Sequence, residues 1–399
     1  MHRRARMRGA VGLLMASLLA LPVAAFAFGD EIVIGALMPQ TKKGASYGVP
    51  QKASVEIAVE EINAKGGIQG RKVRAVIMDT EGNEAVGVQA AQKLIQREKV
   101  LAIVGPAWSS VTEAVFPVCK REKVPCFSPT STKPGISEPH RPWTFRNSKN
   151  EDLLIPETMA WVMEHWKPRT AAILTDIKDS YSKDLGKRTF PNVLREHGVE
   201  IVADFDYQTG DTDFSAIITK VKATNPDVIC LGSTWPEAAN IMKEAGKQGL
   251  IKPYVCGVGC NNERLIDNAG KFAENTIMNV IFNADADDEQ VKHYIAEFKK
   301  KAPDESLSWA WATYYDVPKM VAWAIERAGI DNTEKSLAAD REKVRAQLDQ
   351  LKDYPGITGL TTIDTKTGDA IKASTLLLIK DGKFAVVGQG EAKRPEARK

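Results

Sequence analysis

The sequence predicts an α/β protein with two doubly wound, Rossmann-like lobes, joined by a hinge that the chain crosses more than once. Apolar strand patterns alternate with amphipathic helix patterns from residue 31, and this alternation ends and then starts again near residue 171. Such alternation is typical of parallel sheets covered by helices on both faces. The length agrees, because removing a leader of 27 residues from 399 leaves 372, which suits two domains.

Residues 1–27 have the pattern of an export signal. Four arginines and no acidic residue stand among the first eight positions, Val11–Val23 is mostly apolar, and Ala25-Phe26-Ala27 is a small-x-small cleavage site. We expect the mature chain to begin at Phe28. A retained membrane anchor is the alternative, but the apolar stretch is short for one and Pro22 interrupts it. The pair Arg3-Arg4 lacks the rest of a twin-arginine motif, which favours the general secretory route and a periplasmic location.

The apparent basic charge of the chain comes from this leader. The whole chain has 54 Lys and Arg and 51 Asp and Glu, and the leader holds four of the basic residues and none of the acidic ones, so the mature chain carries a formal charge of −1. A nearly neutral chain gives no reason to expect nucleic acid or anionic lipid as a partner. We expect a monomer without a cofactor or metal.

The first lobe begins with alternating elements over residues 31–127. The predicted strands lie at 31–37, 74–78, 101–104 and 124–127. The predicted helices lie at 51–65 and 85–98, and a further helix, after the turn that follows Gly105, runs to about Lys120. In the helix at 51–65, Val55, Ala58 and Ile62 form one apolar stripe, and Gly66-Gly67 ends it.

The second lobe repeats this order, and the rest of the chain completes both lobes. Strands are predicted at 171–174, 199–205, 228–231 and near Tyr254, with helices at 182–196, 214–223 and from Pro236. Later helices are predicted at 309–329 and 341–351, and strands at 359–364 and 374–384, with Asp381-Gly382 as a hairpin turn. The expected N-terminal lobe comprises residues 28–147 and 277–357, the C-terminal lobe 148–276 and 358–388, and a flexible tail 389–399.

The strongest candidate site lies where a predicted strand ends at Val104-Gly105 and a helix begins. Ser110 and Glu113 have the spacing of a capping box, which predicts Ser110 as the helix cap and leaves Ser109 to face the helix mouth. Free backbone N–H groups and the helix dipole favour an anion there, and a carboxylate is the natural ligand. A capped helix without a ligand is the alternative.

Short hydroxyl residues follow the next strand, at Ser128, Thr130, Ser131 and Thr132, and offer further donors at the same sheet edge. Aromatic side chains stand in turn-like or strand-end settings at Tyr47, Trp108, Tyr181 and Trp235. They suit an apolar or aromatic ligand body, with packing in the core or at a lobe edge as the alternative. Thr234 and Glu237 repeat the capping-box spacing, so we interpret Glu237 as structural.

An enzyme is not indicated by the sequence. The five histidines have no neighbouring nucleophile motif, and the G-x-S-x-G, P-loop and H-E-x-x-H motifs do not occur. Asp285–Asp288 could hold calcium, but the rest of an EF-hand loop does not follow, so a solvated acidic turn is the preferred interpretation. The chain has five cysteines, which allow two disulfides and one free thiol: Cys119, Cys126, Cys230, Cys256 and Cys260. The pairing stays open. The alternative is that all five are unpaired and serve as small apolar side chains in the core.

Several segments, in this order, resemble the branched-chain amino acid-binding proteins of ABC importers, which are type I periplasmic solute-binding proteins. The segments are Gly35–Pro39, Tyr47-Gly48, Ala58–Gly70, Val104-Gly105, Val124-Pro125, Ser128-Pro129 and Asp213–Ser215. The resemblance covers essentially the whole mature chain, and the part ending in Asn63-Ala64-Lys65-Gly66-Gly67-Ile68 is the most specific.

The resemblance implies two lobes that close on a ligand, and a permease partner in the inner membrane. It implies that the ligand carboxylate meets Ser109 and Thr132, that a backbone carbonyl contact falls at Thr130, and that Tyr47 and Tyr181 reach in from the rims. The full set of candidate ligand-binding residues is Tyr47, Trp108, Ser109, Ser110, Thr130, Ser131, Thr132, Tyr181, Thr234, Trp235 and Val258.

The second lobe departs from the family pattern. Val258 stands near the position of the glutamate that holds the ligand's ammonium, and a family tyrosine is replaced around Thr234-Trp235. A buried ammonium without a partner is unfavourable. We therefore expect a carboxylate ligand, amino acid-like or, more in keeping with these replacements, an aromatic or other organic acid. The expected function is the solute-binding component of an importer, and a periplasmic ligand sensor of the same fold is the alternative.

Overall fold

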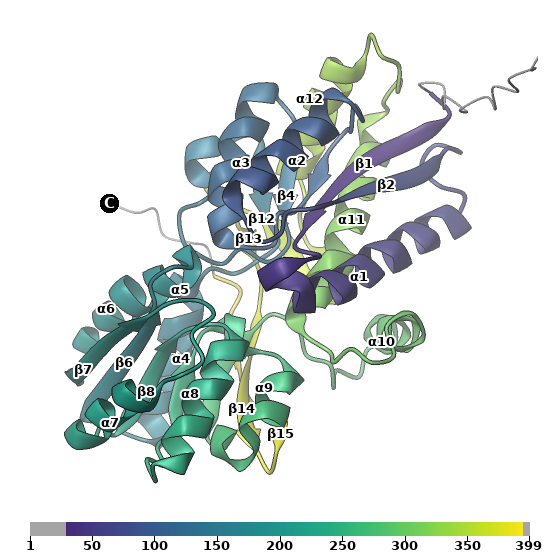
Figure 1. Cartoon of the computed structure of the whole chain (residues 1–399). Coiled ribbons are helices and arrows are strands. Elements are labelled where there is room, and N and C mark those ends of the chain that lie inside the picture. Colours follow the sequence, from purple (N-terminus) through teal and green to yellow (C-terminus); the bar gives the residue numbers. More distant parts are fainter. Residues whose placement is uncertain (1–28, 394–399) are drawn as a thin grey trace, which may run out of the picture.

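The computed structural model describes residues 29–393, which form two α/β lobes, each built on its own sheet (Figure 1). The first sheet has five parallel strands in the order β2-β1-β3-β4-β5. Its strands are β1 Glu31–Met38, β2 Lys72–Asp79, β3 Ile103–Val104, β4 Cys126–Ser128 and β5 Thr144–Arg146. The predicted export signal lies outside the described residues.

Helices cover both faces of this first sheet. They are α1 Ala45–Ala64, α2 Glu84–Gln96, α3 Ser109–Glu122, α11 Trp309–Ala328 and α12 Leu337–Asp349. One face buries Val55 of α1 and Met320 of α11 against Ile34, and the other buries Leu94 of α2 and Val115 of α3. A small sheet of three strands completes the lobe, with β11 Tyr354–Gly356, β12 Gly359–Ile363 and β13 Ala370–Ile371.

The second sheet has seven strands in the order β15-β14-β10-β9-β8-β6-β7. Its strands are β6 Thr170–Asp176, β7 Glu200–Tyr207, β8 Val228–Gly232, β9 Tyr254–Cys256, β10 Thr276–Val280, β14 Ser374–Lys380 and β15 Lys383–Gly390. The strands from β7 to β10 are parallel, whereas β14 and β15 form an antiparallel hairpin at the edge. The predicted turn at Asp381-Gly382 is confirmed, because Lys380 pairs with Lys383.

The helices of the second half follow the predicted rhythm with additions. They are α4 Glu151–His165, α5 Ser180–Asp184, α6 Phe190–Glu196, α7 Ser215–Thr224, α8 Trp235–Lys247, α9 Glu263–Ala269 and α10 Glu289–Lys301. A π-helical segment at Leu185–Thr189 divides the helix that the sequence predicts at 182–196. Short 3₁₀ segments lie at Lys42–Gly44, Glu138–His140, Val258–Cys260 and Gly270–Ala273.

The predicted α/β fold with two doubly wound lobes is confirmed, and the settings of two tyrosines are corrected. Helix α1 begins at Ala45, so Tyr47 lies in its first turn, and Tyr181 lies in the first turn of α5. Both had been interpreted as turn residues because each adjoins glycine or serine. The backbone instead continues into a helix, which holds each tyrosine on a fixed face.

The chain passes between the lobes after β5, after β10 and before β14 (Figure 1). The first predicted boundary, 147/148, falls in the segment between β5 and α4. The second, 276/277, falls inside β10, and the third, 357/358, falls inside the small sheet. Because β10 and β14 pair with each other, we propose that the second and third boundaries lie after Val280 and before Ser374.

A buried ion pair and a buried lysine join the segments where the chain crosses. The Arg146 guanidinium donates two bonds to the Asp369 carboxylate, at 2.6 and 2.5 Å, and also bonds the backbone carbonyls of Ser131 and Lys133. Lys372 donates to Asn147 Oδ1 at 2.9 Å and to Thr358 Oγ1. The Arg146 bonds tie the crossing segments to the loop after β4, and the Lys372 bonds tie the crossing segments to each other.

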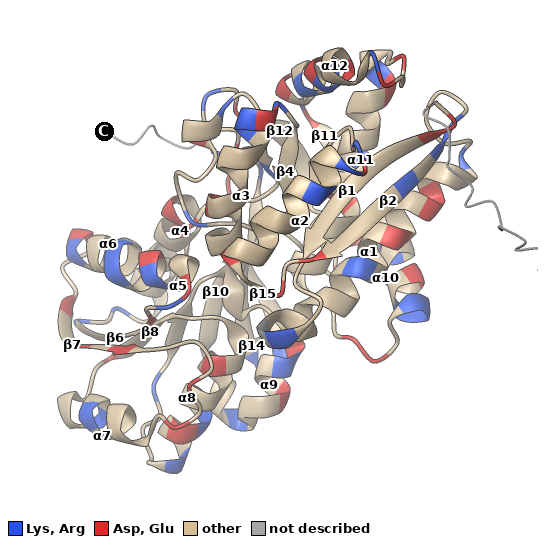
Figure 2. Ribbon diagram, turned by 45° about the horizontal axis from the view of Figure 1, so that its top comes forward, with Lys and Arg blue, Asp and Glu red and all other residues tan. Residues whose placement is uncertain are grey.

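Basic and acidic residues are interleaved on the ribbons of both lobes (Figure 2). Within residues 29–393, no helix combines the length and the apolar character needed to cross a bilayer.

Candidate ligand-binding cleft

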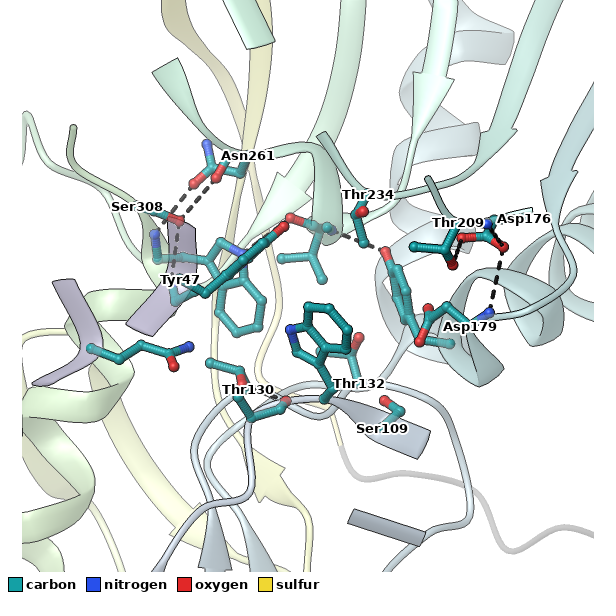
Figure 3. A pocket seen from close by; sticks show the side chains of 18 residues that line it. Tyr47, Ser109, Thr130, Thr132, Asp176, Asp179, Thr209, Thr234, Asn261 and Ser308 are labelled. Atoms are coloured by element: carbon teal, nitrogen blue, oxygen red, sulfur yellow. Dashed lines mark hydrogen bonds between the residues drawn. The ribbon is translucent and has the colours of Figure 1, made fainter. Parts of the chain in front are cut away.

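A cleft lies between the lobes at the carboxyl ends of the central strands, where ligands bind in doubly wound folds. The space between its walls is about 680 Å³, part of it open to solvent. The lining residues are Tyr47, Gln51, Ala107, Trp108, Ser109, Thr130, Thr132, Asp176, Asp179, Tyr181, Thr209, Thr234, Val258, Gly259, Asn261, Ser308, Trp309 and Ala310. Figure 3 shows Ser109, Thr130 and Thr132 on one wall, Tyr47, Asn261 and Ser308 towards one end, and Asp176, Asp179 and Thr209 towards the other.

The N-terminus of α3 opens into this cleft without a side-chain cap. Its N-cap residue is Trp108, whose side chain accepts no capping hydrogen bond, and the first helical residue is Ser109. The predicted capping box is therefore wrong. Ser110 lies within the helix and does not line the cleft, and Glu113 pairs with Lys133 instead. Without a capping side chain, the first N–H groups of α3 remain available to an anion.

Ser109 and Thr132 lie together on the N-terminal wall, as predicted. The Ser109 hydroxyl oxygen accepts a bond from the Lys133 N–H at 3.4 Å. The Thr132 hydroxyl lies 3.4 Å from Oε1 of Glu151, the first residue of α4. The loop after β4 thus places two hydroxyl groups beside the mouth of α3.

The other hydroxyls of this loop are used inside the protein. The Thr130 hydroxyl donates to the carbonyl of Ala107 at 2.6 Å, although the residue still lines the cleft. The Ser131 hydroxyl contacts Ser128, Thr112 and the Ala107 carbonyl, and Ser131 does not line the cleft. The Ser131 hydroxyl thus joins the two strand-end loops, which does not support the prediction that it contacts a ligand.

Tyr47 and Tyr181 both line the cleft, but only Tyr181 has a hydrogen-bond partner. The Tyr181 hydroxyl oxygen accepts from the Gly259 N–H at 3.0 Å. The Tyr47 hydroxyl makes no hydrogen bond within the described chain, and its ring packs edge-on against Trp108 and Trp311 with centroids 6.0 and 5.5 Å apart. Burial raises the pKa of both phenols, so both stay neutral.

The C-terminal wall is formed partly by residues that the sequence indicated. Val258 lines the cleft, donates its N–H to Glu151 Oε1 at 3.2 Å and accepts from the Trp309 indole N–H at 3.0 Å. Thr234 lines it too, and its hydroxyl donates to Glu237, which supports the structural interpretation of Glu237. Trp235 does not line the cleft, because the first turn of α8 turns it into the core.

Two acidic residues of the second lobe were missed by the sequence reasoning. Asp176 ends β6 and accepts bonds from the N–H groups of Lys178, Asp179 and Thr209. Asp179 caps α5 by accepting from the N–H and hydroxyl of Ser182, and burial raises its pKa to about 6. Their position directly after a strand was a usable signal. No lysine, arginine or histidine is among the described lining residues.

The remaining lining residues come from segments without a sequence signal. Gln51 lies one turn after Tyr47 on α1, and Ser308, Trp309 and Ala310 begin α11, far away in the sequence. Ser308 caps α11 by accepting from the Ala310 N–H, and its hydroxyl donates to the Asn261 carbonyl at 2.9 Å. Only the packing of α11 against α1 brings these residues to the cleft.

All five cysteines are free and buried in the structure, so neither possible disulfide is formed. Burial raises the pKa of Cys230 to about 12, which keeps this thiol protonated. Within residues 29–393, no group of three or more histidine, cysteine or acidic residues is arranged to hold a metal ion.

The chain matches the family model described as periplasmic binding protein over residues 31–383. The Leu/Ile/Val-binding protein BraC3 of Rhizobium johnstonii is 28% identical over 356 residues, which cover 88% of this chain and 93% of the relative. The branched-chain amino acid transporter substrate binding protein LivJ of Streptococcus pneumoniae, solved in complex with isoleucine, is 28% identical, with a TM-score of 0.79 and coverage of 92% of this chain and 100% of LivJ.

A third comparison concerns the fold. A solute binding protein of an ABC transporter from R. palustris, solved in complex with 4-hydroxybenzoate, has a TM-score of 0.80 at 21% identity, with coverage of 92% of this chain and 98% of that one. The relatives are binding proteins and not enzymes, as the sequence indicated for this chain. The resemblance noted in the sequence is thus confirmed: this chain belongs to the periplasmic binding protein family and is similar to its branched-chain amino acid-binding members.

Proposed function

We propose that this protein is the extracytoplasmic solute-binding component of an ABC importer and delivers a small carboxylate-bearing ligand to its permease. The observation that carries the proposal is the uncapped N-terminus of α3, which opens into the cleft beside Ser109 and Thr132. Free N–H groups at a helix start and the helix dipole together favour a carboxylate. The two hydroxyls add donors to the same group.

The walls around this carboxylate position favour an apolar or aromatic ligand body. Trp108, Tyr47 and Trp309, the first residue of α11, face the cleft from the first lobe, and Val258 faces it from the second. By the family resemblance, Val258 stands near the position of the glutamate that holds an α-ammonium, so we infer that an organic acid without an α-amine suits the cleft better than leucine does. The complex of the R. palustris protein with 4-hydroxybenzoate shows that this fold accommodates such a ligand.

Function then depends on closure of the two lobes over the ligand. A ligand that contacts Ser109 in one lobe and Val258 in the other stabilises the closed arrangement, because only that arrangement offers both sets of contacts. In this proposal, the permease recognises the closed form.

Isothermal titration calorimetry with the mature protein tests the ligand class. The panel comprises benzoate, 4-hydroxybenzoate, succinate, glutamate and leucine, and we expect binding of at least one carboxylate, with an aromatic acid preferred to leucine. Tight leucine binding would remove the preference for an acid without an amine. Absence of binding to any carboxylate would remove the proposed function. Uptake of the bound ligand by vesicles containing the cognate permease distinguishes an importer component from a sensor.

A further inference from the structure

Gln51 is a buried amide without a partner in the protein. Its side chain is 1% exposed, yet its Oε1 has no hydrogen-bond partner, and no bond to its amide is found among residues 29–393. Buried polar side chains are nearly always hydrogen-bonded, so each exception calls for a cause. Gln51 lines the ligand cleft, so a bound ligand could supply the missing hydrogen-bond partner.

Tyr47 is the second unpartnered group on the same face of α1. It precedes Gln51 by four residues, and side chains at that spacing lie next to each other on a helix. Its ring is held between Trp108 and Trp311, so the position of the hydroxyl is defined. That hydroxyl faces Thr234 across the cleft but makes no hydrogen bond of normal geometry.

The neighbouring polar groups at this end of the cleft are already used. The Ser308 hydroxyl bonds the Asn261 carbonyl, and Asn261 Oδ1 accepts from the Trp309 N–H at 3.3 Å. Among the described residues at this end, Tyr47 and Gln51 keep unpaired polar atoms, as does the amide nitrogen of Asn261. In Figure 3, Tyr47 lies towards one end of the cleft and Ser109 lies on the wall, on the side nearer Asp179, which separates Tyr47 from the proposed carboxylate position.

The chemistry of the pair defines the group that it can bind. A phenol and a carboxamide are uncharged, and each can donate and accept. They suit a neutral group that does both, such as a hydroxyl or a carboxamide. An anion at the same place would lack a counter-charge, since the described lining holds no cation. The buried Glu237 carboxylate, which adds to the effect of burial in raising the pKa of the Tyr47 phenol, disfavours an anion further.

We propose that Gln51, with Tyr47, forms a second polar subsite that binds a hydroxyl or carboxamide at the end of the ligand remote from its carboxylate. The inference rests on the proposed function and narrows its ligand class to carboxylates with such a distal group. Gln51 then determines specificity, because a ligand without the distal group leaves the amide buried and unpaired.

Matched ligand pairs test this subsite by calorimetry. The pairs are benzoate and 4-hydroxybenzoate, pentanoate and 5-hydroxypentanoate, and norvaline and 5-hydroxynorvaline. In the wild type we expect the hydroxylated member of at least one pair to bind about tenfold more tightly or better, since a site built to bond a hydroxyl rejects the analogue without it. In Gln51→Met the hydroxylated ligand and its parent acid should bind about equally. In Tyr47→Phe the preference for the hydroxylated ligand should decrease.

The melting temperature separates a binding role from a structural one. Because the Gln51 amide makes no bond in the protein, ligand-free Gln51→Met should melt at the wild-type temperature or above it. Lys52→Met is the matched control, since Lys52 is exposed and makes only a 3.9 Å surface ion pair with Glu56, and it should keep the preference.

Three results would overturn the inference. Parent acids that bind as well as their hydroxylated partners would do so while leaving the proposed function intact. A preference for the hydroxylated ligand that persists in Gln51→Met would also overturn the inference. The third such result is a melting temperature of ligand-free Gln51→Met several degrees below that of the wild type. If no member of any pair binds, the carboxylate function fails and the subsite with it.

Discussion

The Thr132 hydroxyl lies 3.4 Å from Oε1 of Glu151, and the Glu151 N–H donates to the Thr132 carbonyl at 3.1 Å. A cleft residue of the first lobe is therefore attached to the first residue of α4 in the second lobe. Because Glu151 Oε1 also accepts from Val258, one carboxylate contacts both walls of the cleft. Its protonation state and the loop that holds Thr132 both bear on ligand binding.

Removing either hydroxyl of the N-terminal wall should weaken the binding of the preferred carboxylate. A hydrogen bond to a charged group contributes about 1.5–3 kcal/mol, so Ser109→Ala and Thr132→Ala should each raise Kd by roughly 10- to 150-fold without unfolding the protein. Ser110→Ala is the control, because Ser110 lies in the same helical turn but outside the cleft lining. Calorimetry measures all three. Unchanged affinity in both test variants would contradict the carboxylate position.

Glu151 should make the folded protein less stable as the pH rises from about 4.5 to 7. Burial raises the pKa of Glu151 to about 7, well above its ordinary value, so in this range the folded state binds more protons than the unfolded state. The effect amounts to at most about 3 kcal/mol. The stability of Glu151→Gln relative to the wild type, measured as the difference in the free energy of unfolding, should therefore increase as the pH rises from 5 to 8. Denaturant titrations at both pH values measure this, and an equal difference between the two proteins at both would be inconsistent with the assignment.

Loss of the Arg146 guanidinium should affect both stability and ligand binding. Breaking a buried ion pair destabilises by about 3–5 kcal/mol, because Asp369 is left charged and buried. Arg146 also holds the carbonyls of Ser131 and Lys133 on either side of Thr132. Arg146→Met should therefore lower the melting temperature and raise Kd. A variant with wild-type affinity at a temperature where it is folded would show that the loop keeps its shape without Arg146.

Asp179→Asn should strengthen the binding of benzoate-type acids. Two carboxylates in one cleft repel each other, by on the order of 1 kcal/mol at an effective dielectric constant near 20. Asparagine can still cap α5, so the fold should be kept. An amine-bearing ligand would instead lose affinity, which makes this variant a direct test of ligand class. Asp213→Asn, at an exposed position outside the cleft, is the control.

The cysteines should be present as five unreactive thiols. All five are buried and unpaired, which keeps reagents in the solvent from reaching them. Thiol titration should find no fast reaction in the folded mature protein and five thiols per chain in denaturant. A count of three or one would show that one or both possible disulfides form.

Much of the architecture could be predicted from local patterns. The alternation of strands such as 228–231 with amphipathic helices indicated the doubly wound lobes, because apolar periodicity follows directly from burial on one or two faces. The first residues of helices were predicted less accurately from the sequence. The Ser110–Glu113 spacing has the form of a capping box, yet the N-cap is Trp108, two residues before Ser110, and Glu113 bonds Lys133, a partner on another loop.

The sequence by itself determined the fold class, the family resemblance and the two hydroxyls, Ser109 and Thr132, that line the N-terminal wall. Each depends on residues close together in the chain. Only the tertiary structure decided which side chains complete the cleft. Ser131 and Trp235 point into the protein, whereas Gln51 and Trp309 reach the cleft because α1 and α11 pack together. Contacts between segments more than 250 residues apart depend on packing, which no local pattern encodes.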